Sequence, residues 1–332
     1  MKFSIQRDHL HHPLQQVIGA VERRQTLPAL AHVLIRSDAK RVSFTTTDLE
    51  IELSATLEME VEDPGEATLP ARKLLDICNS LPGDALLEIS VENNRGAIKS
   101  GGSRFSLAGL PADDFPVLED IAGQQSLTLA QGEFKTLLER TGFAMASQDV
   151  RYYLNGLMLE IGDNRLRAVA TDGHRLAMCD LDAAKGTETT RQVIVPRKAI
   201  QELQRLLDSG DAQAELQLSD NHLRMQLPCL RFTSKLIDGR FPEYERVIPR
   251  DGDKTLSVER AAFRQALTRA SILSNEKYRG IRLVLGGDQI LIQAHNPEQE
   301  EAEVQLEANY RGEPLEMGFN VTYLFDVLSA VE

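Results

Sequence analysis

The sequence has no tryptophan, and aromatic residues make up only 5% of its 332 residues. Cysteine is also scarce, with three residues at Cys78, Cys179 and Cys229 and no CxxC pair among them. Isolated, widely spaced cysteines argue against a disulfide framework and against a zinc site, because both need ligands or partners at short characteristic spacings. We therefore expect reduced thiols and no bound metal or cofactor.

Long apolar stretches are absent as well. No window approaches the about 18 consecutive apolar residues of a membrane-spanning helix. The N-terminal sequence MKFSIQRDHLHHPLQQ is polar and lacks the apolar core and small-residue cleavage site of a signal peptide. These absences predict a cytoplasmic globular protein with no membrane partner, and its length suits two or three domains of about 100–200 residues each.

Basic residues are outnumbered by acidic ones, with 37 Lys and Arg against 50 Asp and Glu and a formal charge of −13. Proteins that coat nucleic acid do so by neutralising phosphates with Lys and Arg. The composition therefore excludes binding over the whole surface, although it permits basic residues gathered on one face.

Catalytic motifs are missing too. The chain has no Gly-Lys dipeptide, hence no Walker A loop, and neither HExxH nor GxSxG. Fragments typical of penicillin-binding proteins, SNEK at 274–277 and SDN at 219–221, occur in the wrong order and without KTG, so we interpret both as chance. His9, His11 and His12 do not share one helix face. We predict no catalytic residue.

An internal repeat organises what is present. Strand-turn-strand patterns begin at His32, Gly156 and Gly280, and the pairs Thr47-Asp48, Thr171-Asp172 and His295-Asn296 recur at 172 − 48 = 124 and 296 − 172 = 124 residues. A helical pattern precedes each of these stretches. A second one follows each, over 69–81, 195–207 and 320–331.

The repeat predicts an α+β fold of three tandem modules, each with two helices and antiparallel strands. We place the domains at 1–122, 123–250 and 251–332, with breaks near 119–126 and 249–255. Repeats one and two end with an Arg-Phe strand followed by Phe-Pro, which the third repeat does not contain. By this comparison the third module is incomplete, by roughly 35 residues.

Several of the predicted helices carry a basic face. After Pro196, apolar Ile200 and Leu203 lie on one side, and Arg197 and Arg205 lie on the other. A single helix of this kind is usually an ordinary solvated surface. Its recurrence near Glu259 in an acidic protein indicates segregated charge, and this favours a surface that faces phosphates without reading base sequence.

Long motifs resemble the bacterial sliding clamp, the beta subunit of DNA polymerase III. They include LPARK, QDVRYYLNG (148–156), ATDGHRLA (170–177), VPRK, FTSKLIDGRFPEY (232–244), ILSNEKYRG (272–280), HNPEQEEAE (295–303) and FNVTYLFDVL (319–328), and they run over nearly the whole chain. The resemblance implies a non-catalytic processivity factor, in which two three-domain chains join head to tail as a ring around double-stranded DNA, with helices lining the hole.

The resemblance also implies particular residues. The predicted DNA-binding set is Arg24, Arg72, Gln148, Tyr152, Tyr153, Arg197 and Lys198. Peptides of the replicative polymerase, the clamp loader, other DNA polymerases and repair proteins would bind a pocket formed by Leu154, Thr171, Gly173, His174, Arg175, Leu176, Pro242, Arg246 and Val247. His174 beside Asp172 lacks a nucleophile partner and is therefore interpreted as pocket wall.

Ring closure would bring Phe105 and Leu107 on one edge against Ile272 and Leu273 on the other edge of a second copy. Opposite charges would support this contact, because Lys73, Arg95 and Lys99 lie in the first repeat, whereas Glu298, Glu300, Glu301 and Glu303 lie in the third. The alternative is an oligomeric peptide-binding adaptor that does not close a ring because its C-terminus is missing.

Overall fold

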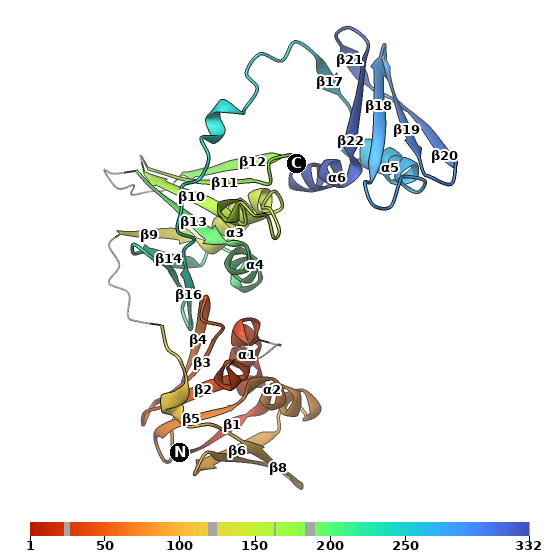
Figure 1. The fold of residues 1–332 in the computed structure, drawn as a ribbon. Coiled ribbons are helices and arrows are strands. Elements are labelled where there is room, and N and C mark those ends of the chain that lie inside the picture. Colours follow the sequence, from red (N-terminus) through yellow and green to blue (C-terminus); the bar gives the residue numbers. More distant parts are fainter. Residues whose placement is uncertain (23–26, 119–124, 163, 183–189, 332) are drawn as a thin grey trace. The chain divides into compact units, whose positions relative to one another are not determined.

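The computed structural model describes residues 1–22, 27–118, 125–162, 164–182 and 190–331 (Figure 1). They form two compact units. The first unit comprises Met1–Asp172 and Leu176–Arg240, and the second comprises Gly173–Arg175 and Phe241–Glu332. Each unit has its own hydrophobic core.

The described part of the first unit contains four α-helices, which are α1 (Arg7–Val17), α2 (Ala71–Ser80), α3 (Gln131–Gly142) and α4 (Arg197–Leu206). Its strands in the first repeat are β1 (Lys2–Gln6), β2 (His32–Ser37), β3 (Arg41–Thr47), β4 (Ile51–Glu58), β5 (Gly65–Pro70), β6 (Leu86–Glu92), β7 (Arg95–Ser100) and β8 (Ser103–Ala108). Those of the second repeat are β9 (Gln125–Ala130), β10 (Gly156–Gly162), β11 (Arg165–Thr171), β12 (Leu176–Asp182), β13 (Arg191–Pro196), β14 (Gln213–Leu218), β15 (His222–Gln226) and β16 (Leu230–Lys235).

One long sheet joins the two repeats. Its strand order is β5-β2-β3-β4-β16-β15-β14-β9, so strands of the first repeat pair directly with strands of the second. The junction is the antiparallel pair β4–β16, with Leu230 opposite Ala55 and Phe232 opposite Leu53. Two four-stranded sheets, β1-β6-β7-β8 and β12-β11-β10-β13, complete the unit.

Burial of apolar side chains sets the inner face of each helix, and the preceding strand sets where the helix begins. In α4, Ala199, Ile200 and Leu203 are buried, as the spacing predicts for one apolar face. The sequence places this helix at 195–207 and its counterpart at 69–81, and both are shorter in the structure. The difference arises because Val195-Pro196 and Leu69-Pro70 belong to strands β13 and β5, so each helix starts after its proline.

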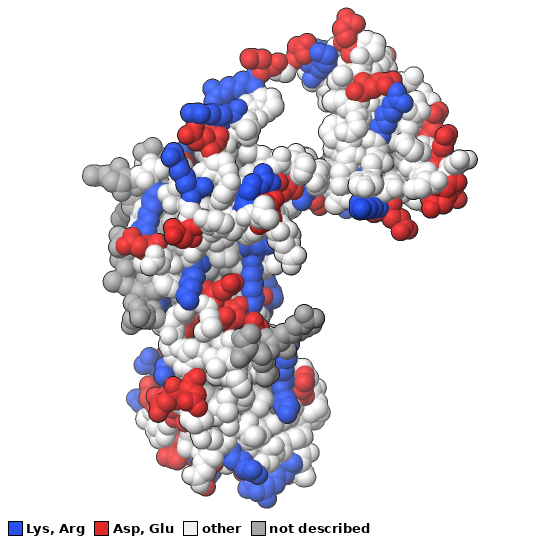
Figure 2. Space-filling model, viewed as in Figure 1, with Lys and Arg blue, Asp and Glu red and all other residues white. Residues whose placement is uncertain are grey.

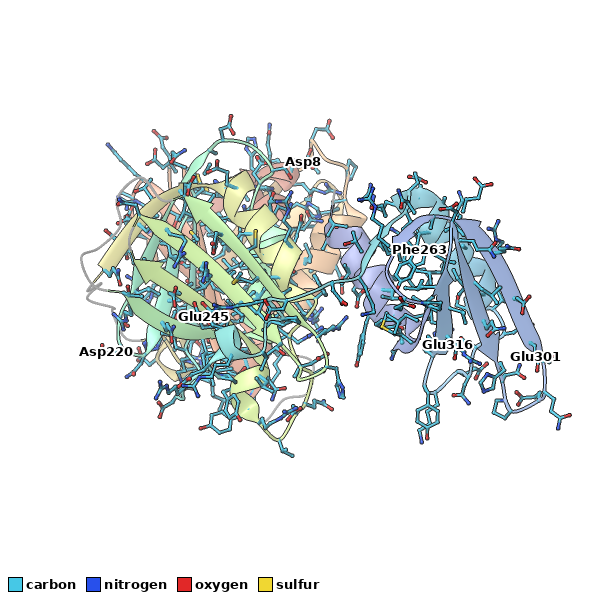
Figure 3. The ribbon with its side chains drawn as sticks, turned by 90° about the horizontal axis from the view of Figure 1, so that it is seen from above. Asp8, Asp220, Glu245, Phe263, Glu301 and Glu316 are labelled. Carbon is cyan, nitrogen blue, oxygen red and sulfur yellow. The ribbon has the colours of Figure 1, made fainter. Side chains whose placement is uncertain are left out.

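The second unit contains α5 (Arg260–Ser271), α6 (Val321–Ala330) and the strands β17 (Thr255–Ser257), β18 (Gly280–Gly286), β19 (Gln289–His295), β20 (Glu301–Glu307), β21 (Asn309–Arg311) and β22 (Leu315–Asn320). The main sheet has the order β20-β19-β18-β22. Figure 3 shows Phe263 of α5 directed into the core of this unit, and Glu301 at the outer edge on β20.

The core of the second unit is less covered than that of the first. Helix α6 fully buries only Val321, whereas α2 and α4 each bury three side chains. In the first unit, three strands follow each of α2 and α4, namely β6–β8 and β14–β16. No strand follows α6 within the described residues. Leu324 and Leu328 of α6 are partly buried.

Cys78 and Cys229 should differ sharply in reactivity. Cys78 on α2 is fully buried, and this burial raises the pKa of its thiol to about 11, whereas Cys229 is exposed. Because the thiolate is the reactive form, iodoacetamide at mildly alkaline pH is expected to modify Cys229 and spare Cys78. Peptide mapping by mass spectrometry tests this, with the denatured protein as control. Equal labelling of the two in the folded protein would contradict the placement of Cys78.

Candidate nucleic-acid interface and peptide site

The basic residues of α4 are held by specific partners. Arg197 donates from Nη1 to the carbonyl oxygen of Met145 at 2.7 Å, and its backbone N–H donates to Asn155 O at 3.0 Å. Lys198 Nζ binds the carboxylate of Asp48, which lies in the β3–β4 turn of the first repeat. The start of α4 is therefore fastened to a neighbouring loop and to the other repeat.

Arg205, near the end of α4, is engaged in an ion pair and in hydrogen bonds to backbone carbonyls. It pairs with Glu202 at 2.7 Å and donates to the carbonyl oxygens of Gln15 and Gln16 on α1, at 3.1 and 2.6 Å. These bonds satisfy carbonyls near the C-terminal end of α1, where the helix leaves them without partners of its own. The basic face that the sequence predicts on α4 is thus partly used to join two repeats.

The predicted residues of the first repeat are only partly observed. Arg72 on α2 is exposed and donates from Nη2 to Val21 O at 3.2 Å. Arg24 lies outside the described residues. Figure 1 shows α1, α2, α3 and α4 on the same side of the long sheet of the first unit, so Arg72 belongs to the helical side that also carries Arg197 and Lys198.

A closed loop carries the predicted aromatic contacts. The side chain of Asn155 bridges it, accepting from Asp149 N at 2.9 Å and donating to Asp149 O at 2.9 Å. Ala146 N also donates to Leu154 O at 3.0 Å. Gln148 has a positive φ of 58°, which marks the tight bend at the start of the loop.

The two tyrosines of this loop differ in exposure. Tyr152 is 57% exposed and Tyr153 is partly buried, and their rings meet edge to face with centroids 5.7 Å apart. A Cβ at Gly239 would lie 3.4 Å from the Tyr152 ring, so this glycine lies against the ring. Tyr152 therefore offers an accessible aromatic face, the feature that base stacking needs, while Tyr153 supports it.

The predicted peptide-binding residues fall in both units. Leu154, Thr171 and Leu176 belong to the first unit, where Leu154 is 2% exposed and the other two are partly buried. Gly173, His174, Arg175, Pro242, Arg246 and Val247 belong to the second unit. Of these, Val247 is 69% exposed and is an accessible apolar side chain.

Within the second unit, the segment 173–175 contacts α6. Arg175 binds the carboxylate of Asp326 and lies 4.6 Å from the centroid of the Tyr323 ring, while the His174 ring stacks on Tyr323 at 6.3 Å. A guanidinium held over an aromatic ring and paired with a carboxylate is well ordered. His174 and Arg175 are therefore fixed groups, able to orient a ligand.

The predicted ring-closing residues lie at sheet edges or on an exposed loop. Phe105 and Leu107 belong to the edge strand β8; Phe105 is partly buried, but Leu107 is only 8% exposed and packs in the core. Ile272 is 74% exposed and follows α5 directly, while Leu273 is partly buried. Figure 2 shows acidic side chains gathered over the edge strand β20 of the second unit, which carries Glu301 and Glu303.

Features that would suit other functions have structural explanations. Ser274 of the SNEK fragment is 5% exposed, and its hydroxyl donates to Ser271 O at 2.7 Å, so it continues the end of α5. No group of three or more His, Cys, Asp or Glu able to hold a metal ion occurs among the described residues. None of the described helices has the length and apolar character that crossing a bilayer requires.

Two residues that position the site were not recognised from the sequence. Asp48 marked only a repeat position, and Asn155 lay inside a motif without a role of its own. Their partners lie 150 residues away, at Lys198, and six residues away, at Asp149. The recurrence of Thr-Asp at Thr47-Asp48 and Thr171-Asp172 was the one signal that pointed to the Asp48 turn.

Known proteins match this chain over its whole length. Models of the DNA polymerase III beta subunit match residues 1–119 (N-terminal domain), 128–243 (central domain) and 245–332 (C-terminal domain). The beta sliding clamp of Pseudomonas putida is 53% identical over 332 residues, covering 100% of this chain and 90% of the relative. That of Escherichia coli K12 is 48% identical over 333 residues, covering 100% and 91%.

A solved structure has the same fold. The crystal structure of a sliding clamp, DNA polymerase III subunit beta, from Pseudomonas aeruginosa bound to griselimycin superposes with a TM-score of 0.95 at 53% identity. The match covers 100% of this chain and 90% of that one.

The substitution Asn155→Ala tests whether this side chain holds the loop. It removes two hydrogen bonds and should lower the free energy of unfolding by about 1–3 kcal/mol. Amide exchange at Asp149 should accelerate by more than this global change accounts for. The control is Asn221→Ala in the β14–β15 turn, where the exposed residue contributes its backbone carbonyl to Leu236 N. Equal effects of both variants on Asp149 exchange would refute the bridging role.

Proposed function

Because this chain belongs to the DNA polymerase III beta subunit family, the beta sliding clamps, we propose that it is a DNA replication processivity factor. Two copies join head to tail as a ring around duplex DNA, and the ring tethers polymerases to their template. The observation that carries this proposal is the repeated pair of helices, α1–α2 and α3–α4, on one side of a sheet shared by both repeats (Figure 1). A continuous outer sheet with helices inside suits a rigid arc around DNA.

The contacts to DNA would be weak and independent of sequence. Arg72, Arg197 and Lys198 supply point charges for phosphates, and Tyr152 supplies a stacking face, so no base edge is read. Nonspecific contacts of this kind reach dissociation constants of about 10⁻⁴–10⁻⁶ M. A closed ring makes such affinity sufficient, because leaving the DNA then requires opening the ring.

The protein itself would perform no chemistry and need no cofactor. Ser274, the nucleophile that the SNEK fragment would need, is buried and bonded to the backbone. The processivity role that the family implies is that of a tether, with catalysis left to the polymerase it holds. It would act on replicating DNA, and we therefore expect it in the cytoplasm of a bacterial cell.

Partner proteins would bind through short peptides at the residues of segment 173–175 and near Val247, all in the second unit. Fixed His174 and Arg175 would orient the peptide, and exposed Val247 would contact an apolar anchor. The griselimycin complex of the Pseudomonas aeruginosa relative supports a ligand site in this fold. The replicative polymerase, the clamp loader, and other polymerases and repair proteins are the proposed partners.

Ring closure would pair unlike edges of the two chains. The strand β8 and its neighbour β7 expose Arg95, Lys99 and Arg104, whereas β20 exposes Glu301 and Glu303. Edge strands with open hydrogen-bonding groups favour pairing, and opposite charge selects the head-to-tail arrangement. Exposed Ile272 would add an apolar contact with Phe105. The three domains of each chain would span 1–122, 123–250 and 251–332.

Retention on DNA should depend on topology. The assembled clamp is expected to stay on nicked circular DNA many times longer than on a linear duplex of the same sequence, because it slides off free ends. Surface-coupled lifetime measurements test this after loading by a bacterial clamp loader. Blocking both ends of the linear duplex should restore the long lifetime. Equal lifetimes on open linear and circular DNA would contradict a topological tether.

The oligomeric state separates the clamp from the adaptor alternative. Native mass spectrometry is expected to show a homodimer, and the double charge reversal Glu301→Lys with Glu303→Lys should shift it towards monomer. Adding Arg95→Glu and Lys99→Glu to the same chain should restore dimer if these groups face one another. A wild-type monomer that still binds peptides would support the adaptor instead.

A further inference from the structure

The ion pair of Lys198 with Asp48 crosses from the second repeat to the first. Lys198 is the second residue of α4, and Asp48 opens the turn between β3 and β4. Their side chains differ in exposure: Lys198 retains 41% and Asp48 only 5%. The carboxylate is therefore shielded from solvent and counterions, while the ammonium that it binds remains accessible at the surface.

The turn itself fixes the carboxylate. Asp48 Oδ1 accepts hydrogen bonds from Glu50 N at 2.9 Å and Ile51 N at 2.7 Å, while Oδ2 binds Lys198. Leu49 adopts a positive φ of 75° within this turn. With one oxygen committed to the backbone and the other to the ammonium, the side chain of Asp48 cannot swing away from Lys198.

The two repeats cannot separate easily at this point either. Beyond the ion pair, Arg205 of α4 donates to two carbonyls of α1. Glu202 lies between Lys198 and Arg205 on α4, and Gly19 of the first repeat lies so close to it that a Cβ at this glycine would fall 2.0 Å from the carboxylate. Seven residues separate Lys198 from Arg205, about 10 Å along the helix. Helix α4 is thus held against the first repeat over about two turns.

From these contacts we infer that Asp48 is a positioning residue that weakens the electrostatic attraction between Lys198 and a DNA phosphate. An ammonium has three donors, so Lys198 can bind Asp48 and a phosphate at once. The fixed carboxylate nevertheless cancels most of its charge and repels an approaching phosphate. Lys198 then contacts the DNA backbone only weakly, which suits a ring that must slide. This inference rests on the proposed function.

Replacing the carboxylate should make the contact stronger. Asp48→Asn keeps an oxygen for the turn N–H groups and removes the charge. Affinity for a short linear duplex should rise about two- to fivefold, the range for one ion pair between the exposed ammonium of Lys198 and a phosphate. The slope of log affinity against log salt should steepen by about 0.9, the value for one additional phosphate contact.

Glu50→Gln is the matched control. It lies in the same turn and changes the net charge by the same amount, but its exposed carboxylate makes no ion pair within the described part of the chain. Affinity and salt slope should therefore change less than in Asp48→Asn. Equal changes in the two variants would show that general charge, and not the pair with Lys198, is responsible, and would overturn the inference.

Lys198→Gln supplies an independent test that does not disturb the turn. If Asp48 restrains Lys198, this substitution should lower the wild-type salt slope by well under 0.9, and Asp48→Asn should have no effect on binding in its presence. A full loss of 0.9 in the wild type, or a gain that persists in the double variant, would overturn the inference. Wild-type protein that fails to bind duplex at low salt would instead overturn the proposed function.

Discussion

The antiparallel pairing of β4 with β16 is the constraint on which the arrangement of the first unit depends. It merges strands of two repeats into one eight-stranded sheet, so that neither repeat has a free edge at the junction. Every contact between α4 and the first repeat follows from it. Without this pairing, Lys198 would not meet Asp48, nor would Arg205 reach the carbonyls of α1.

Charge in this protein serves two purposes on the same helix. In an acidic chain, basic residues on a helical face suggest nucleic-acid contact, and Lys198 with Arg197 keeps that role in the proposed function. Arg205 is instead consumed by Glu202 and by backbone carbonyls, where it joins repeats. A basic helix face can therefore combine side chains that are available for a ligand with side chains that hold the fold together. The partners of each side chain show which of the two roles it has.

Much of the architecture could be predicted from the sequence. A repeat of 124 residues, read from Asp48, Asp172 and Asn296, predicts three related α+β modules, and the second helix of each module lies within two residues of the predicted bounds. Apolar periodicity sufficed because burial of one face is a local property of a helix or strand. A contact role for Tyr152 was also predicted from a long motif, and this side chain is exposed.

The partners of the site residues could not be predicted in the same way. Sequence by itself determined the module, its repetition and the types of residue on each face, because these depend on neighbours a few positions apart. Only the tertiary structure decided that Asp48 faces Lys198, that Asn155 closes its loop, and that Leu107 is core rather than surface. The contact of Asp48 with Lys198 joins segments 150 residues apart, and its geometry exists only after β4 has paired with β16. The bridge from Asn155 to Asp149 spans only six residues, but it depends on how the loop folds back on itself, which residue types do not reveal.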